Sequence, residues 1–251
     1  MGGPYLYASE KKGIGLGAKQ PKERILALDV AWYYTWGPRA IEGIPLSKFV
    51  PMVWGRHLYP KELNTLQRLG KIPFLLAFNE PDHPDQANMS VDEAIRMWPE
   101  ISTLSNQISS PAPAQALGPW LEKFVQVAKF KKQNFDFVAV HLYGPPDTKI
   151  FLDRVDKIYQ KYQLPIWITE FAVADYSAKG KPGKNRFSEA SVLSFMKAVL
   201  PELEKRKYVM RYAWFGAGKF SASGHEQVRT SRLFESDGSL TALGKFYANF
   251  N

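Results

Sequence analysis

Short apolar segments alternate with segments of helical periodicity along the whole chain. Each apolar segment ends at glycine, proline, asparagine or a charged residue, a pattern typical of βαβ units and a parallel sheet. The expected strands are residues 13–16, 31–35, 49–54, 73–78, 107–110, 137–142, 165–169 and 212–215. Eight such units in 251 residues, with no linker between halves, favour a closed (β/α)8 TIM barrel of the α/β class over a doubly wound open sheet. We therefore expect a single domain spanning residues 1–251.

Capping residues mark the helices between these strands. Ser90 and Glu93 form a capping box ahead of one apolar stripe, and Asp147 can cap the helix that follows strand 137–142. A later stripe, from residue 192 to 203, contains Pro201. We expect this proline to kink or shorten its helix, because it lacks an N–H donor.

Composition excludes several classes of function. The chain has no cysteine, so disulfides, thiolate metal sites and cysteine nucleophiles are excluded. The formal net charge is +9, but the basic residues lie in scattered groups such as 129–132 and 204–207, which are typical of solvated helix faces. We expect this charge to serve solubility rather than nucleic-acid binding. No stretch reaches the roughly 18 apolar residues of a membrane helix, so no membrane partner is expected.

The first residues, MGGPYLYASEKKG, lack the apolar region of a signal peptide. Two interpretations stay open: a cytoplasmic protein, or a protein whose signal has been replaced by an artificial Met-Gly-Gly start. We expect a secreted or periplasmic monomer, without excluding the cytoplasm.

Two glutamates directly follow strong apolar segments. Glu80, preceded by Asn79, ends the segment FLLAFNE, and Glu170 ends PIWITE. In a (β/α)8 barrel the chemistry lies at the carboxyl ends of the strands, and an unpaired carboxylate there costs stability. Either glutamate alone is equally consistent with a surface or ion-paired residue. Together they predict a site, because strands four and seven lie across the barrel from each other.

Two carboxyl groups about 5–5.5 Å apart suit a retaining glycosidase mechanism. Glu170 would attack as a carboxylate, and Glu80 would donate and later accept a proton. The negative charge of Glu170 is expected to raise the pKa of Glu80 and keep it protonated.

The motifs NEPD and WITEF resemble those of the clan A glycoside hydrolases. With YYTWG, PMVWG, HLYG and WFGA, the chain looks most like glycoside hydrolase family 128, over residues 12–250. This resemblance implies a retaining β-1,3-glucanase acting on laminarin- or curdlan-type glucans, which we expect to be endo-acting. It also implies Glu80 as acid/base, Glu170 as nucleophile, and Asn79 as the residue that hydrogen-bonds the sugar 2-hydroxyl.

Other polar and aromatic residues follow the strands. His141 and Tyr143 are expected to hydrogen-bond Glu170, although a lone histidine is often purely structural. Three tryptophans are expected to stack on sugar rings, with core packing as the alternative: Trp36, Trp54 and Trp214. Weaker candidates are Tyr34, Phe171, Asp82, His225 and Glu226, of which the last two are expected in a solvated loop. The loop 176–186, rich in glycine and lysine, is either a mobile wall of the cleft or an unstructured surface loop.

No competing motif is present. The sequence contains no GxGxxG, P-loop, HExxH or GxSxG motif, nor the DxxDxDxE motif of family 18 chitinases. The histidines, at positions 57, 83, 141 and 225, lack the close spacing of a metal site. We expect no cofactor and no metal. Two other functions stay open: a protein that binds β-1,3-glucan without cutting it, and a hydrolase of another β-linked polysaccharide such as β-1,4-mannan or cellulose.

Overall fold

The computed structural model describes residues 9–58, 60–68, 72–216 and 225–251. Parallel strands form two sheets. The larger has the order β2-β1-β7-β6-β5 and the smaller pairs β3 with β4. The strands are β1 (Lys12–Gly15), β2 (Trp32–Tyr34), β3 (Ile72–Leu75), β4 (Ser105–Ile108), β5 (Val138–Gly144), β6 (Ile166–Val173) and β7 (Val209–Trp214).

Isolated parallel bridges join the two sheets into a (β/α)8 barrel. Tyr33 pairs with Phe49, Met52 with Leu76, and Ser109 with Phe137. The expected strand 49–54 is therefore present only as single bridges. Pro51 lies in its middle and has no N–H to donate, which limits the pairing that this segment can make.

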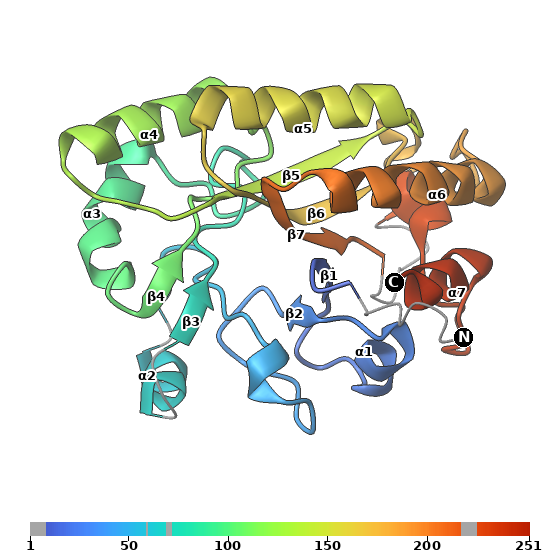
Figure 1. Ribbon diagram of the computed structural model, residues 1–251, viewed down its shortest axis with the longest axis horizontal. Coiled ribbons are helices and arrows are strands. Elements are labelled where there is room, and N and C mark those ends of the chain that lie inside the picture. Colours follow the sequence, from blue (N-terminus) through green and yellow to red (C-terminus); the bar gives the residue numbers. More distant parts are fainter. Residues whose placement is uncertain (1–8, 59, 69–71, 217–224) are drawn as a thin grey trace, which may run out of the picture.

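Helices surround the strands (Figure 1). They are α1 (Glu23–Leu28), α2 (Pro60–Arg68), α3 (Val91–Ile101), α4 (Pro119–Phe130), α5 (Thr148–Tyr162), α6 (Glu189–Lys205) and α7 (Ala242–Asn249), with 3-10 turns η1 (Leu46–Lys48), η2 (Tyr176–Ala178) and η3 (Glu226–Ser231). Neighbouring helices contact each other around the barrel: α3 with α4, α5 with α6, α6 with α7, and α7 with α1. None of the helices in the described ranges is both long and apolar enough to cross a membrane.

The expected caps are present. Ser90 and Glu93 form a reciprocal capping box at the start of α3, and the Asp147 side chain accepts from the backbone N–H of Ile150 at the start of α5. Pro201 was expected to kink or shorten its helix. It does not shorten the helix, because α6 continues through it to Lys205. A buried apolar face, rather than one backbone hydrogen bond, holds this helix in place.

Aromatic side chains fill the barrel interior. Trp167 packs against Trp32 and Phe137, with ring centroids 5.3 and 4.3 Å apart. Towards the amino ends of the strands, the guanidinium of Arg211 lies 4.3 Å from the Trp167 ring centroid and 4.7 Å from that of Phe74. Since the interior is packed, a ligand can enter only at an end of the barrel.

Candidate active site

A cleft of about 1110 Å³ opens at the carboxyl ends of the strands. It brings together six residues expected from the sequence: Trp36, Trp54, Asn79, Glu80, Tyr143 and Glu170. These residues come from five different strand ends or the loops directly after them. The carboxyl face of this barrel therefore carries the candidate site, as the fold predicts.

Glu170 lies inside β6 rather than after it, because β6 continues to Val173. The pairing register between β5 and β6 shifts at Val140 and His141, and the pairing with β7 shifts between Ile168 and Phe171. Such irregularities re-aim side chains near the rims of barrels. His141 and Glu170 become register partners directly after the shift.

Three donors surround the carboxylate of Glu170. The hydroxyl of Tyr143 donates to Oε2 over 2.5 Å, and the indole Nε1 of Trp36 donates to Oε1 over 2.7 Å. The hydroxyl of Tyr34 lies 3.3 Å from Oε1 and also donates to the Thr169 carbonyl over 2.9 Å. Donors on both oxygens fix the orientation of this carboxylate.

Burial keeps both tyrosines in their donating form. Removal of water raises the pKa of Tyr143 well above its usual value, and the charge of Glu170 raises it further. The same two causes, in the same order, raise the pKa of Tyr34. Both hydroxyls are therefore protonated at neutral pH and can donate to Glu170.

The main contact of Trp36 is the hydrogen bond from its indole N–H to Glu170, and its expected stacking on a sugar stays a prediction. Its backbone φ of 54° lies in the left-handed region, which is uncommon for a bulky residue. Trp36 is the second residue after β2, at a point where the chain bends. Trp36 is thus a donor to the carboxylate, while Trp54 is a half-buried aromatic wall of the cleft.

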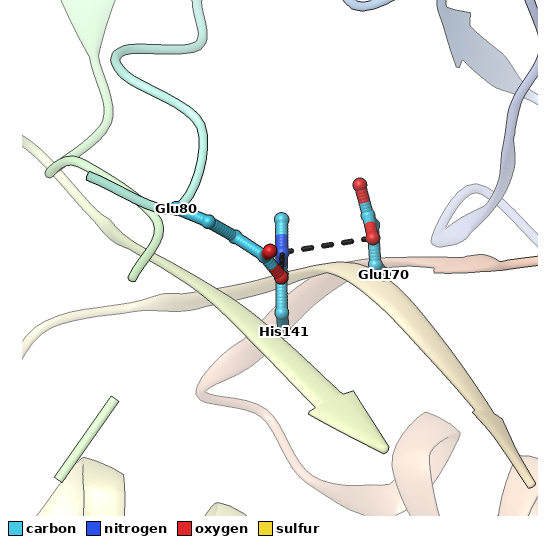
Figure 2. A group of neighbouring side chains, drawn as sticks. All are labelled: Glu80, His141 and Glu170. Carbon is cyan, nitrogen blue, oxygen red and sulfur yellow. Dashed lines mark hydrogen bonds and ion pairs between the residues drawn. The ribbon is translucent and has the colours of Figure 1, made fainter. Parts of the chain in front are cut away.

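Glu80 reaches the cleft from the loop after β3. Its backbone is also left-handed, with φ of 41°, and its N–H donates to the Ala112 carbonyl over 2.8 Å. Its Oε1 lies 2.8 Å from Nδ1 of His141, and the same nitrogen lies 3.6 Å from Oε2 of Glu170. His141 therefore lies between the two glutamates and bonds mainly to Glu80, not to Glu170 as expected (Figure 2).

This geometry changes the electrostatics expected from the sequence. Burial acts to raise the pKa of Glu80, but the hydrogen bond and charge of His141 outweigh it, so the pKa is lowered. The expectation of a raised pKa for Glu80 is therefore wrong. Burial acts to lower the pKa of His141, but the charge of Glu170 and the bond to Glu80 outweigh it, so the pKa is raised.

The two glutamates converge as predicted. One oxygen of Glu80, one oxygen of Glu170 and a ring nitrogen of His141 all lie within 4.8 Å of one another. This spacing is close to the ~5–5.5 Å typical of retaining glycosidases and shorter than the ~6.5–9.5 Å of inverting ones. The three groups are also a donor set that a divalent cation could use, although the bond between His141 and Glu80 already occupies two of them.

Asn79 lines the cleft beside Glu80. Its Nδ2 donates to Oε1 of Gln86 over 3.2 Å. Its Oδ1 is buried and has no hydrogen-bond partner among the described residues. Because an unpaired buried acceptor costs about 1–3 kcal/mol, this atom is suited to accept a hydrogen bond from a bound hydroxyl.

Trp214 does not reach the cleft, so the expectation that it stacks on a sugar is wrong. It is fully buried, its Nε1 donates to the Ser231 carbonyl over 2.8 Å, and its ring packs against Phe171 and Phe195. Side chains alternate between the two faces of a strand. Ala213 faces the barrel interior, and Trp214 therefore faces the helices.

The weaker candidates take several positions. Asp82 accepts from the backbone N–H groups of Ala114 and Gln115, over 2.7 and 3.0 Å, and so ties together two loops that line the cleft. The expectation of a solvated loop at residues 225 and 226 is wrong. His225 lines the cleft, and Glu226 is only 2% exposed.

Several cleft residues were missed by sequence reasoning. They are His83, Asp85, Gln86, Gln115, Arg154, Lys179 and Gln227. Arg154 comes from α5, whose apolar periodicity gave no reason to single out one arginine. His83, Asp85 and Gln86 lie in or beside the Pro-Asp turns that follow Glu80, and Lys179 lies in the loop 176–186, so their positions after strands were the only signal.

Known proteins resemble this chain over most of its length. A family model described as glycosyl hydrolase catalytic core matches residues 15–247. Alkali-sensitive linkage protein 1 of Schizosaccharomyces pombe is 26% identical over 87% of the chain, which spans 40% of that relative's length.

Solved structures are similar in fold. An endo-β-1,3-glucanase variant of glycoside hydrolase family 128 from Amycolatopsis mediterranei, in complex with laminarihexaose, has a TM-score of 0.81 and 29% identity, covering 97% of this chain and 100% of that chain. A family 128 endo-β-1,3-glucanase from Sorangium cellulosum has a TM-score of 0.78 and 25% identity, covering 96% and 98%. These neighbours confirm the resemblance to family 128, and the chain belongs to the family of the glycosyl hydrolase catalytic core.

Proposed function

We propose that the protein is a retaining endo-β-1,3-glucanase with Glu80 as acid/base and Glu170 as nucleophile. One observation carries the proposal: the two carboxyl groups converge within 4.8 Å in a cleft, and donors on both oxygens hold one of them. The linkage is inferred from neighbours of similar fold that are β-1,3-glucanases.

In the first step, Oε1 or Oε2 of Glu170 attacks the anomeric carbon while Glu80 protonates the departing glycosidic oxygen. The bond to the leaving sugar breaks, and an ester to Glu170 forms. Tyr143 and Trp36 hold the attacking carboxylate in line. Asn79 would bind the sugar 2-hydroxyl through its unpaired Oδ1.

In the second step, water hydrolyses the ester. Glu80, now a carboxylate, removes a proton from water, whose oxygen attacks the anomeric carbon and frees Glu170. Two inversions leave the configuration of the anomeric carbon unchanged. The same two residues therefore account for both halves of the reaction.

The proton for the first step is shared between Glu80 and His141. In the resting site the proton is held mainly on the imidazole, since the pKa of Glu80 is lowered and that of His141 is raised. The hydrogen bond of 2.8 Å between them lets it return to Glu80 as negative charge develops on the leaving oxygen. His141 would thus supply the proton that a carboxyl with a lowered pKa lacks.

We further propose that residues 1–251 act as one catalytic domain and as a monomer. We expect the protein to be secreted or periplasmic, because a glucan polymer is too large to enter a cell. Long glucans need a cleft that passes across the barrel face, and lining residues from all sides of the barrel are consistent with endo action.

Single substitutions of the glutamates test the proposal. Glu80→Gln and Glu170→Gln are each expected to remove nearly all laminarin hydrolysis, whereas Glu122→Gln, on the exposed surface of α4, should retain it. Rates on laminarin, β-1,4-mannan and carboxymethylcellulose would identify the linkage. Normal turnover by either active-site variant would refute the assignment, and binding of laminarin without release of reducing sugar would indicate a recognition protein.

A further inference from the structure

Two residues with no role in the chemistry above line the cleft beside the catalytic glutamates. Tyr176 begins the η2 turn shortly after β6, the strand of Glu170. Arg154 projects from α5, which follows β5, the strand of Tyr143. Adjacent strands therefore bring these two side chains to the same side of the cleft.

Tyr176 exposes an aromatic ring at the rim of the cleft. The residue is 62% exposed, the most exposed aromatic side chain lining the cleft, and its hydroxyl has no hydrogen-bond partner in the described part of the chain. Loss of water around the hydroxyl raises the pKa of Tyr176, and the charge of Glu80 raises it further, while Arg154 opposes the rise. The hydroxyl end thus lies within electrostatic range of both Glu80 and Arg154.

Arg154 is held in place but incompletely bonded. Its Nη1 donates to the Tyr143 carbonyl over 3.0 Å, which fixes the guanidinium beside the residue that holds Glu170. Among the described residues no carboxylate lies within ion-pair distance of it, and its other nitrogens have no acceptor. A guanidinium carries five N–H groups, so several are free to donate to a ligand in the cleft.

Buried polar contacts anchor the loop that carries Tyr176. Asp175 is buried and accepts from the backbone N–H, Nε and Nη2 of Arg186 over 2.9, 3.0 and 2.9 Å. It also accepts from the N–H and Oγ of Ser177. Both ends of the loop 176–186 are therefore tied together, which fixes Tyr176 at the cleft and argues against a wholly unstructured loop.

We propose that Tyr176 and Arg154 form a glucosyl-binding subsite next to the bond that is cleaved. The exposed ring would stack on the apolar face of a pyranose, and the guanidinium would donate to its hydroxyls. This subsite rests on the proposed β-glucan function. In this subsite the loop after the nucleophile strand binds the substrate directly, in addition to lining the cleft.

Binding of laminarihexaose to the inactive Glu170→Gln protein tests the subsite. Adding Tyr176→Ala is expected to raise the Kd about tenfold, equivalent to ~1.4 kcal/mol. Tyr176→Phe keeps the ring and should change the Kd less than about twofold, and Arg154→Gln should raise it about threefold or more. Lys181→Ala, in the same loop but outside the cleft lining, is the matched control and should leave it unchanged.

Thermal unfolding of each variant separates binding from folding. The subsite predicts weaker binding at an unchanged unfolding temperature for Tyr176→Ala. Equal affinity of Tyr176→Ala and its parent would overturn the subsite while leaving the proposed function intact. Failure of the unsubstituted protein to hydrolyse laminarin would instead overturn the proposed function.

Discussion

Nδ1 of His141 lies 2.8 Å from Oε1 of Glu80, so an imidazole and a carboxyl share a hydrogen bond at the centre of the cleft. Oε2 of Glu170 lies 3.6 Å from the same nitrogen, and Asp82 and His83 add weaker charges. Groups coupled this closely titrate as a pair rather than singly. The pH dependence of the protein should therefore belong to the pair.

The activity of the enzyme should fall at high pH when the pair loses its last proton. Because the pKa of His141 is raised, kcat/KM on laminarin should decline only above the ordinary histidine value of 6.5. In His141→Asn, Glu80 alone must hold the proton, and the decline should move to lower pH. A pH profile of each protein measures this, with the exposed His57→Asn as control. An unmoved profile in His141→Asn would refute the shared proton.

The two pKa shifts also predict how the free energy of unfolding depends on pH. Because the pKa of His141 is raised in the folded protein, its contribution to the free energy of unfolding is complete below pH 6.5. That contribution is lost as the pH rises through the higher pKa of the folded state. Because the pKa of Glu80 is lowered in the folded protein, its contribution to the free energy of unfolding is complete above pH 4.5. That contribution is lost as the pH falls through the lower pKa of the folded state. The free energy of unfolding lost in His141→Asn should therefore be largest between pH 4.5 and 6.5. Urea titrations across pH measure it, and a pH-independent difference would contradict it.

Tyr143→Phe removes the hydroxyl that donates to Oε2 of Glu170 over 2.5 Å. Hydrogen bonds to charged groups contribute about 1.5–3 kcal/mol, so kcat should fall about 10- to 100-fold. The fold should be retained because the ring stays. Steady-state kinetics on laminarin measure the loss, with Tyr159→Phe on α5 as control. A kcat within twofold of the parent would show that Tyr143 does not hold the nucleophile.

Trp36→Phe distinguishes the donor role from sugar stacking. The substitution keeps an aromatic ring but removes the Nε1 that lies 2.7 Å from Oε1 of Glu170. Loss of a donor to the nucleophile should lower kcat with little change in KM, whereas loss of a stacking surface should raise KM. Separate kcat and KM values on laminarihexaose decide between them, and a raised KM with normal kcat would favour stacking.

The fold was largely predictable because each strand carries its own local signal. Apolar runs bounded by turn residues located the barrel strands to within a few residues. The segment 49–54 was the exception, because it forms single bridges and not a continuous strand. Pro51 interrupts its pairing. At Pro201 the sequence predicted a shortened helix, but α6 continues past it. Packing of α6 against the core outweighs the loss of one helical hydrogen bond.

The site was predictable where position alone determines it. Glu80 and Glu170 follow apolar runs on opposite sides of the barrel, so their convergence follows from strand order. The bonding of Trp36 and His141 depends on side-chain rotation and on local shifts in register, which one-dimensional patterns do not contain. Trp214 shows the same limit, because one residue along the strand decides between the barrel interior and the helix layer.

The stereochemistry of laminarihexaose cleavage tests the central assignment most directly. Proton NMR recorded during the first turnovers would follow the anomer of each released reducing end before it equilibrates. The convergence of Glu80 and Glu170 within 4.8 Å predicts that the β-anomer appears first, through an intermediate bonded to Glu170. First appearance of the α-anomer would show that water attacks the sugar directly, and would contradict Glu170 as the nucleophile.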